Sequence, residues 1–201
     1  GVVNLIEKII NIGSRIHEYT NKLVFSFSDI GVYDKVKRNL SNYGVDYREW
    51  TTDDMKAFAK SLQMVNEQLG WNLELATCSE KIDFDEYGIK HNSCVDDVLI
   101  TKIAYEDKEL MDFLGMEIHK RGESLLGDDI DEIPIGAIDL ADGYYAVRTK
   151  GNRDGGQRKL CGCIFSKDIG EYNTCVHLCK YCYANTNNDV TIANYKRHMM
   201  N

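Results

Sequence analysis

Hydrophobic residues recur every three to four positions in several stretches of the chain, a spacing typical of amphipathic helices. Leu5, Ile9, Ile12 and Ile16 form one such stripe, which predicts a helix over residues 2–18. Two further stripes and an apolar stretch over residues 94–104 predict three more helices. The first of these stripes is Val32, Val36 and Leu40, and the second is Met55, Phe58, Leu62, Val65 and Leu69.

Short apolar runs rich in β-forming residues lie between the predicted helices. LVFSFS at residues 23–28, LELAT at 73–77 and YYAVR at 144–148 predict strands. Strands that alternate with helices indicate an α/β fold. A complete eight-stranded (β/α) barrel needs about 250 residues, whereas this chain has 201. We therefore expect a partial, TIM-like barrel fragment that ends in a cysteine-rich C-terminal loop segment.

The composition changes along the chain and divides it into three regions. Residues 1–114 carry most of the helix and strand patterns and are expected to form the partial barrel, and residues 155–201 are rich in cysteine and are expected to bind metal. Residues 115–154 include Glu123 to Asp142, with seven acidic and no basic residues, which predicts an exposed excursion and connector. The chain begins with Gly and not with Met, so we expect it to be a piece of a longer protein.

Charge is distributed unevenly along the sequence. The whole chain has a formal net charge of -8, but residues 147–201 hold nine basic and four acidic residues, a net charge of +5. A basic segment of this kind fits an anionic ligand, a cofactor or a nucleic acid, and equally an ordinary solvated surface. No apolar run reaches the ~18 residues of a membrane span, so we expect no membrane partner.

Seven cysteines are the strongest chemical signal in the sequence. They are too few for a disulfide scaffold, and no secretory segment is evident, which predicts the reducing cytoplasm. In that compartment clustered thiols are typical of metal ligands or catalysts. Five of the seven lie between positions 161 and 182, so the chemistry is expected there.

Cys175, Cys179 and Cys182 stand on one short stretch, with three and then two residues between them. Three thiolates so spaced can converge on an iron–sulfur cluster and leave one iron open to a non-protein ligand. A zinc ion is the alternative, although zinc sites usually show paired CxxC units. The candidates for a fourth zinc ligand are Cys161, Cys163 and His177.

The sequence CVHLCKYC, with Tyr181 before the last cysteine, resembles the cluster-binding loop of radical S-adenosylmethionine enzymes. The resemblance implies that Cys175, Cys179 and Cys182 hold a [4Fe–4S] cluster, with S-adenosylmethionine on the fourth iron and Tyr181 near the adenine. It also implies reductive cleavage of S-adenosylmethionine to a 5′-deoxyadenosyl radical that acts on an unknown substrate. The electrons would come from a reductant such as flavodoxin or ferredoxin.

A longer resemblance links four pieces of the chain to the C-terminal part of domain-of-unknown-function family 1848. The pieces are FSFSDIGVYDKVKRNL, LELATCSEKIDFDEYGI, HNSCVDD and residues 161–185. The C-terminal cysteines of that family also look like a radical S-adenosylmethionine loop. Residues that flank this loop and resemble family positions are expected to donate hydrogen bonds around the cluster, and Asn185 is placed with Tyr181 at the cofactor. They are Lys167, Asp168, Tyr172, Asn173 and Asn185.

Cys78, Cys94, Cys161 and Cys163 remain, a full ligand set for a second cluster or a zinc ion. Cys78 ends a predicted strand, and Cys94 begins a predicted helix whose dipole favours a thiolate. Buried cysteines also behave as small hydrophobes. The four thiols are therefore a candidate second metal site with a purely structural alternative.

Two functions from different classes are compatible with these signals. The first is a radical S-adenosylmethionine-like iron–sulfur enzyme. The second is a non-catalytic binding module, stapled by zinc or an iron–sulfur cluster, whose basic tail contacts nucleic acid. The second rests on interleaved cations and aromatic residues, which are Lys180, Tyr181, Tyr183, Tyr195, Lys196 and Arg197.

Overall fold

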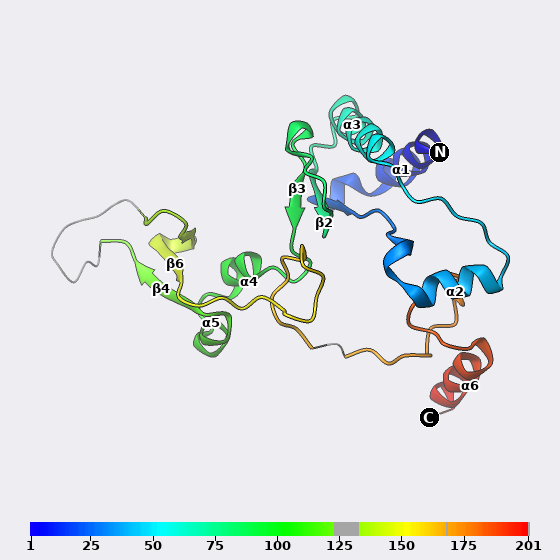
Figure 1. The fold of residues 1–201 in the computed structure, drawn as a ribbon. Helices are drawn as coiled ribbons and strands as arrows, with labels where there is room; N and C mark the ends of the chain where they lie inside the picture. The colour runs from blue at the N-terminus through cyan, green and yellow to red at the C-terminus, as the bar shows by residue number, and fades with distance from the viewer. Residues whose placement is uncertain (123–132, 168, 201) are drawn as a thin grey trace. The chain divides into compact units, whose positions relative to one another are not determined.

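The computed structural model describes residues 1–122, 133–167 and 169–200, and within them the chain forms six α-helices and six β-strands (Figure 1). This mixture confirms the α/β class. The helices are α1 (Val2–Ile16), α2 (Asp34–Asn42), α3 (Thr52–Gln68), α4 (Asp97–Ala104), α5 (Lys108–Leu114) and α6 (Asn188–Met199). The strands are β1 (Lys22–Phe25), β2 (Glu74–Cys78), β3 (Lys90–Asn92), β4 (Met116–Lys120), β5 (Ile138–Asp139) and β6 (Tyr144–Arg148).

The strands form two three-stranded sheets, in the orders β1-β2-β3 and β4-β6-β5. β2 and β3 are parallel, with Cys78 opposite Asn92. β4 and β5 both pair antiparallel with β6. A (β/α) barrel consists of parallel strands, and the described residues form no closed barrel. The expectation of a TIM-like fragment is therefore not confirmed.

The chain divides into two compact units. The first unit contains Gly1–Leu75, Phe84–Ile89 and Lys167–Asn201, and the second contains Ala76–Asp83 and Lys90–Ser166. Each unit thus joins segments that are distant in the sequence. The division into residues 1–114, 115–154 and 155–201, which follows the order of the chain, stays a prediction.

Aromatic side chains form the core of the first unit. The ring centroids of Phe27 and Trp50 are 4.9 Å apart, and those of Phe25 and Phe58 are 5.3 Å apart. Phe84 joins both phenylalanines of the strand region and is 1% exposed. Large aromatic groups bury much apolar surface each, so this cluster holds the N-terminal segments together.

Helix α3 follows its predicted stripe, whereas α1 does not. Phe58 and Leu62 of α3 are buried, as the helical spacing predicts, although Leu69 at the end of the stripe is exposed. In α1 the buried residue is Ile6, while Leu5 and Ile12 of the predicted stripe are exposed. The apolar face of α1 is broad, and the side that packs is centred on Ile6, next to the predicted stripe, so spacing alone does not select it.

The ends of α3 show why this helix is well defined. Thr51 and Asp54 form a capping box, in which the Thr51 hydroxyl accepts a hydrogen bond from the Asp54 backbone N–H and the Asp54 carboxylate accepts one from the Thr51 N–H. Gly70, at φ +65°, follows the last turn. The buried Asn66 side chain then bonds both backbone groups of Leu73, at 2.9 and 3.0 Å, and so fixes the approach to β2.

The core of the second unit packs α5 and β4 against a distant loop. Met111, Leu114 and Met116 are buried together with Ile164. Helix α4 begins at Asp97. The preceding residue, Asp96, is its N-cap, and the Asp96 carboxylate accepts hydrogen bonds from two backbone N–H groups of the first turn. The prediction that a helix begins at Cys94 is therefore wrong, because the capping carboxylate lies two residues further along.

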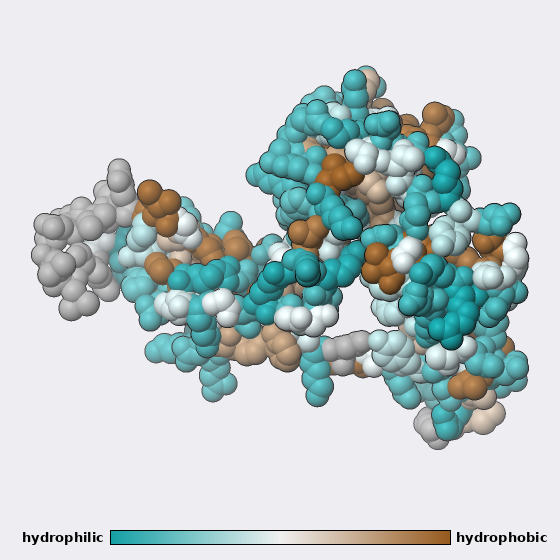
Figure 2. Space-filling view, in the orientation of Figure 1, coloured by the Kyte–Doolittle hydropathy of each residue, from teal (hydrophilic) through white to brown (hydrophobic). Residues whose placement is uncertain are grey.

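Part of the predicted acidic excursion has regular structure. Residues 123–132 lie outside the described part of the chain, but Ile138–Asp139 forms β5 and pairs with β6. In the described part of the chain, no helix combines the length and the apolar character that crossing a bilayer demands. The face drawn in Figure 2 is largely hydrophilic, and its hydrophobic residues form small separate groups.

Candidate metal centres

The seven cysteines are all free thiols and fall into two sets, one in each unit. Cys175, Cys179 and Cys182 belong to the first unit, in an irregular segment that leads to α6. The thiols of Cys175 and Cys179 are exposed and that of Cys182 is half-buried. We call residues 173–186 the thiol loop.

Asn173 closes the thiol loop at its base. Its backbone N–H donates to Ala184 O at 3.3 Å. Its side-chain Oδ1 accepts from both the backbone N–H and the hydroxyl of Thr186, at 2.5 and 2.6 Å. Asn173 has φ +60°, a left-handed conformation that Asn tolerates better than most residues. One residue thus joins the two ends of the loop.

Asn185 lies inside the loop and contacts two of the cysteines. Its side-chain Nδ2 donates to Cys175 O at 2.7 Å, and its backbone N–H donates to Cys182 Sγ at 3.3 Å. The residue is 6% exposed, and its Oδ1 is buried without a hydrogen-bond partner. A buried acceptor of this kind is uncommon, so Asn185 offers an unused polar atom beside the thiols.

Helix α2 supports the loop next to the last cysteine. Asn39 donates its side-chain N–H to Cys182 O at 3.1 Å, and Lys35 donates to Tyr183 O at 2.5 Å. Lys180 lies over the ring of Tyr43, just beyond α2, with its Nζ 5.5 Å from the ring centroid. Nothing in the sequence pattern pointed to Asn39 or Lys35, because their role depends on a contact about 145 positions along the chain.

The other predicted residues of this region are at the surface. Tyr181 is 67% exposed and Tyr172 is 55% exposed. The side chains of Lys167 and His177 are exposed as well, and Asp168 lies outside the described residues. The cofactor role of Tyr181 and Asn185 stays a prediction.

The second set of thiols gathers three segments of the second unit. Cys78 ends β2, Cys94 lies between β3 and α4, and Cys161 and Cys163 lie on the loop after β6. The Sγ atoms of Cys78 and Cys94 are 3.4 Å apart. Cys163 Sγ accepts the backbone N–H of Cys94 at 3.1 Å and that of Val95 at 3.3 Å.

Backbone contacts hold the loop of Cys161 and Cys163 in place. Arg153 Nε donates to Cys161 O at 2.9 Å, and Ile164 N–H donates to Val95 O at 3.2 Å. A Cβ at Gly162, between the two cysteines, would lie 2.5 Å from Ser93 Oγ, so the Ser93 hydroxyl would have to turn away. Glycine therefore allows the close approach of this loop to the segment before α4.

The thiols of the second set influence one another's ionisation. The hydrogen bond with Cys78, together with burial and the neighbouring sulfur charges, raises the pKa of Cys94 to about 11. Burial also raises the pKa of Cys161. Burial acts in the same direction on Cys163, but hydrogen bonds from the Val95 N–H, the Cys161 thiol and the Cys94 N–H outweigh it and lower the pKa of Cys163. Among Cys94, Cys161 and Cys163, the pKa is therefore lowered only at Cys163.

Neither set forms a complete ligand sphere in the structure. Within residues 1–122, 133–167 and 169–200, no group of three or more His, Cys, Asp or Glu side chains is arranged to hold a metal ion. The structure brings Cys78, Cys94 and Cys163 together through pairwise contacts. That the seven cysteines are metal ligands stays a prediction.

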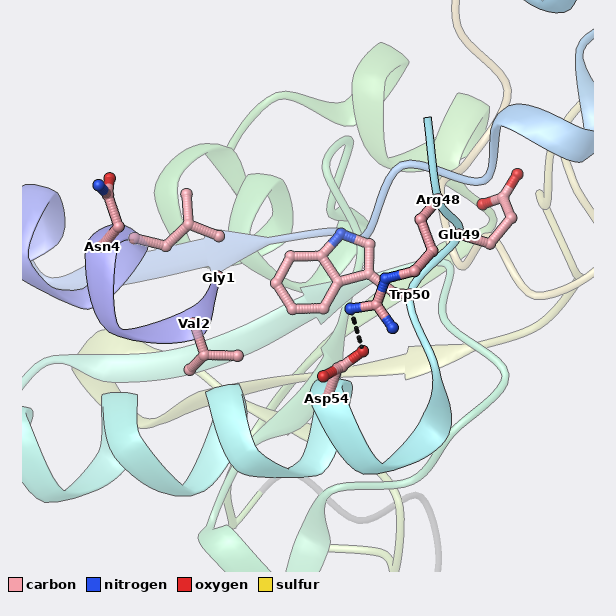
Figure 3. A pocket seen from close by; sticks show the side chains of 8 residues that line it. Gly1, Val2, Asn4, Arg48, Glu49, Trp50 and Asp54 are labelled. Atoms are coloured by element: carbon pink, nitrogen blue, oxygen red, sulfur yellow. Dashed lines mark hydrogen bonds and ion pairs between the residues drawn. The ribbon is translucent and has the colours of Figure 1, made fainter. Parts of the chain in front are cut away.

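A pocket of about 350 Å³ in the first unit contains none of the predicted site residues. The start of α1 and the segment before α3 line it (Figure 3). Its cation, Arg48, already pairs with Asp54 at 2.9 Å. The candidate chemistry therefore lies with the two thiol sets and not with this pocket.

The comparison with family models decides which family the chain resembles. The model described as domain of unknown function (DUF1848) matches residues 2–184. The chain belongs to this family. The match spans all seven cysteines and confirms the predicted family resemblance. It does not show the likeness to radical S-adenosylmethionine enzymes. No curated protein and no solved structure matches the chain.

Proposed function

We propose that this DUF1848 chain is an iron–sulfur protein of the radical S-adenosylmethionine-like type. In this proposal Cys175, Cys179 and Cys182 hold a [4Fe–4S] cluster and leave one iron open to S-adenosylmethionine. The observation that carries it is the thiol loop itself, which presents three cysteines on a segment closed by Asn173. Among the described residues of the first unit, no fourth cysteine accompanies them.

The chemistry of the loop fits such a group. Two of the three thiols are exposed, so a cluster assembled in solution can reach them. The Asn185 N–H that points to Cys182 Sγ stabilises thiolate charge, and the unused Asn185 Oδ1 can accept a hydrogen bond from the amino acid end of a bound cofactor. Metal sites commonly acquire their final geometry only on binding, so the separate thiols would converge as the cluster enters.

The cluster and S-adenosylmethionine, when bound, would supply one-electron reductive cleavage to a 5′-deoxyadenosyl radical for an unknown substrate. The residues of the chain would hold and orient these groups. Asn39 fixes the carbonyl of Cys182, and Tyr181 presents an exposed ring that can stack on the adenine. An external reductant such as flavodoxin or ferredoxin belongs to this proposal.

The wider setting of the protein is part of the same proposal. All seven cysteines are free, which favours a reducing compartment such as the cytoplasm. The parallel pairing of β2 with β3 supports an open segment of a (β/α) barrel.

Anaerobic reconstitution with iron and sulfide tests the proposal. We expect iron and sulfide to bind to the wild-type chain, Cys179→Ala to abolish this binding, and Cys78→Ala to preserve it. S-adenosylmethionine should change the EPR signal of the reduced cluster, and reductant should then yield 5′-deoxyadenosine. A cluster without either response would leave a non-catalytic iron–sulfur protein, and absence of iron with sulfide would contradict the proposal altogether.

A second candidate function is a metal-stapled module that binds nucleic acid. It is favoured by α6, whose last turn carries Lys196, Arg197 and His198, and by the exposed rings of Tyr181 and Tyr183. Cations at a helix C-terminus also have a simpler explanation, since they complement the helix dipole. Binding to single-stranded oligonucleotides that weakens steeply with salt would support this function, and binding independent of salt would exclude it.

A further inference from the structure

We propose that Cys78, Cys94, Cys161 and Cys163 form a second metal site, a tetrathiolate centre for one zinc ion that stabilises the second unit. The site is separate from the thiol loop, and it does not depend on the proposed function. Three observations carry it: the convergence of the segments, the spacing of two sulfur atoms and the hydrogen bonds to a third.

The topology gathers the four cysteines from distant parts of the sequence. The parallel register places Cys78, at the end of β2, opposite Asn92, two residues before Cys94. The loop of Cys161 and Cys163 joins them through the bonds from Cys94 and Val95 to Cys163 Sγ. Four of seven cysteines thus meet at one edge of a parallel strand pair, where α/β proteins commonly place their sites.

The distance between Cys78 Sγ and Cys94 Sγ distinguishes between kinds of centre. It is 3.4 Å, far longer than the about 2.0 Å of a disulfide bond. Two thiolates on a tetrahedral zinc ion, each about 2.3 Å from the metal, lie about 3.8 Å apart. In a [4Fe–4S] cluster each thiolate binds a different iron, which holds the sulfurs further apart. The observed spacing is that of a hydrogen bond between two thiols, and it lies within about 0.4 Å of the separation that one tetrahedral ion requires.

The hydrogen bonds around Cys163 Sγ are those expected around a metal-bound thiolate. Its sulfur accepts hydrogen bonds from the backbone N–H groups of Cys94 and Val95, at 3.1 and 3.3 Å. Such hydrogen bonds to the ligand sulfur orient it and stabilise its charge in metal sites. A purely apolar role for Cys163 does not explain these two donors.

Access and closure of the site are also consistent with metal binding. Cys94 is exposed, which gives an ion a path from solvent to the buried Cys161 and Cys163. The thiols now contact one another in pairs and are not arranged around one point. Binding must therefore draw the sulfurs together, and the free energy of that step stabilises the fold of the second unit.

The test uses the full chain with Cys175, Cys179 and Cys182 replaced by Ser, so that the thiol loop cannot bind metal. This parent variant is titrated with Co²⁺ under reducing conditions, and then with Zn²⁺ in competition. We expect one Co²⁺ per chain, with the strong absorption of tetrahedral cobalt thiolate. Zn²⁺ should displace it, and the metal-loaded parent should melt at a higher temperature than the metal-free one.

Two variants of the parent identify the ligands. Cys163→Ser and Cys94→Ser should each weaken Co²⁺ binding by at least about 100-fold, since losing even an outer partner of a metal ligand costs 10–100-fold. If Cys163→Ser loses its helical circular dichroism, Cys94→Ser, which alters an exposed thiol, decides the question. The wild-type chain is titrated in parallel.

Several results would overturn the zinc site. They are a parent variant that binds neither Co²⁺ nor Zn²⁺, binding that survives both single substitutions, and iron with sulfide in the parent. A disulfide between Cys78 and Cys94 that persists under the reducing conditions of the titration would do the same. Because the proposed function is measured by iron at Cys179 in the unmodified loop, failure of one proposal is distinguishable from failure of the other.

Discussion

Asn173 supports the thiol loop with both its backbone and its side chain. The backbone reaches Ala184, and the single oxygen Oδ1 accepts two hydrogen bonds from Thr186. The left-handed backbone of this residue suits Asn, Asp and Gly better than other residues. Side chains outside the ligand set therefore determine whether the three thiols stay on one closed segment.

We predict that Asn173→Ala opens the thiol loop. The substitution removes the acceptor for two hydrogen bonds and places a Cβ-bearing residue without local polar contacts at φ +60°. A loss of about 1 kcal/mol in local stability corresponds to amide exchange about fivefold faster across residues 174–186. Hydrogen exchange measured by mass spectrometry of the metal-free chain checks this.

Asn173→Asp is the matched control for this prediction. It keeps an acceptor oxygen and tolerates the same backbone conformation, so its exchange should stay close to that of the wild type. Unchanged exchange in the Ala variant would show that the Asn173 contacts do not close the loop.

At the scale of elements, close packing decides the behaviour of α1. A Cβ on Gly13 would collide with the six-membered ring of Trp71, which is 7% exposed and stacks on His17 with ring centroids 5.8 Å apart. The glycine therefore lets the indole lie directly against the helix backbone. This contact, and not the stripe of Leu5 and Ile12, fixes the side on which α1 packs.

We predict that Gly13→Ala destabilises the protein although alanine is the better helix former. The helix propensity gains about 1 kcal/mol, but displacement of a buried indole costs about 1–3 kcal/mol. Urea unfolding followed by circular dichroism should show a lower free energy of unfolding. Ser14→Ala, at the exposed neighbouring position, should show no loss, and a stabilised Gly13→Ala variant would contradict the packing argument.

The capping box of α3 predicts a dependence of stability on pH. Hydrogen bonds from Thr51, and then the charge of Arg48, lower the pKa of Asp54 from 3.8. A carboxyl group whose pKa is lower in the folded state stabilises that state above the unfolded pKa, and the contribution disappears as the pH falls through the folded pKa. We expect Asp54→Asn to lose less stability than the wild type on acidification below about pH 4. Thermal unfolding between pH 6 and pH 3 measures this, and parallel curves would refute it.

The elements that the sequence predicts best are long or strongly patterned. The helix over 52–68 has a capping box and a clear stripe, and YYAVR forms β6. The prediction missed α5, which is only seven residues long, and β4, whose sequence MEIHK has only two apolar residues. It also missed α6, which is weakly amphipathic and has Thr191 as its buried residue. Local spacing indicated the thiol loop, but it did not show that Cys94 and Cys163 are neighbours, because 69 positions separate them.

At the scale of the whole molecule, the two units contain separate thiol sets. Cys175, Cys179 and Cys182 lie in one unit and the other four cysteines lie in the second. The sequence indicates the second set only as the four cysteines that remain after the three of the thiol loop are assigned. The fold shows contacts within that set, such as the one between Cys78 and Cys94. Since no cysteine is shared, each set can bind metal without the other.

We predict that the metal content of the two sets responds independently to substitution. Cys179→Ser should lose iron and sulfide and keep zinc, whereas Cys163→Ser should lose zinc and keep iron and sulfide. The double variant should lose both, as expected for sites with no common partner. Elemental analysis of anaerobically reconstituted protein checks this. Loss of both metals from either single variant would indicate one shared centre.

The contacts that close the thiol loop have a consequence for the order of maturation. Asn173 and Thr186 are 13 positions apart, and loops of this length form in well under a microsecond. The contact between Cys94 and Cys163 spans 69 positions and must await a more distant encounter of the chain. When the complete chain refolds from the unfolded state, the thiol loop can therefore close before Cys94 meets Cys163. During synthesis the order is reversed, because Cys78, Cys94, Cys161 and Cys163 are all made before Cys175, at roughly 5–20 residues per second.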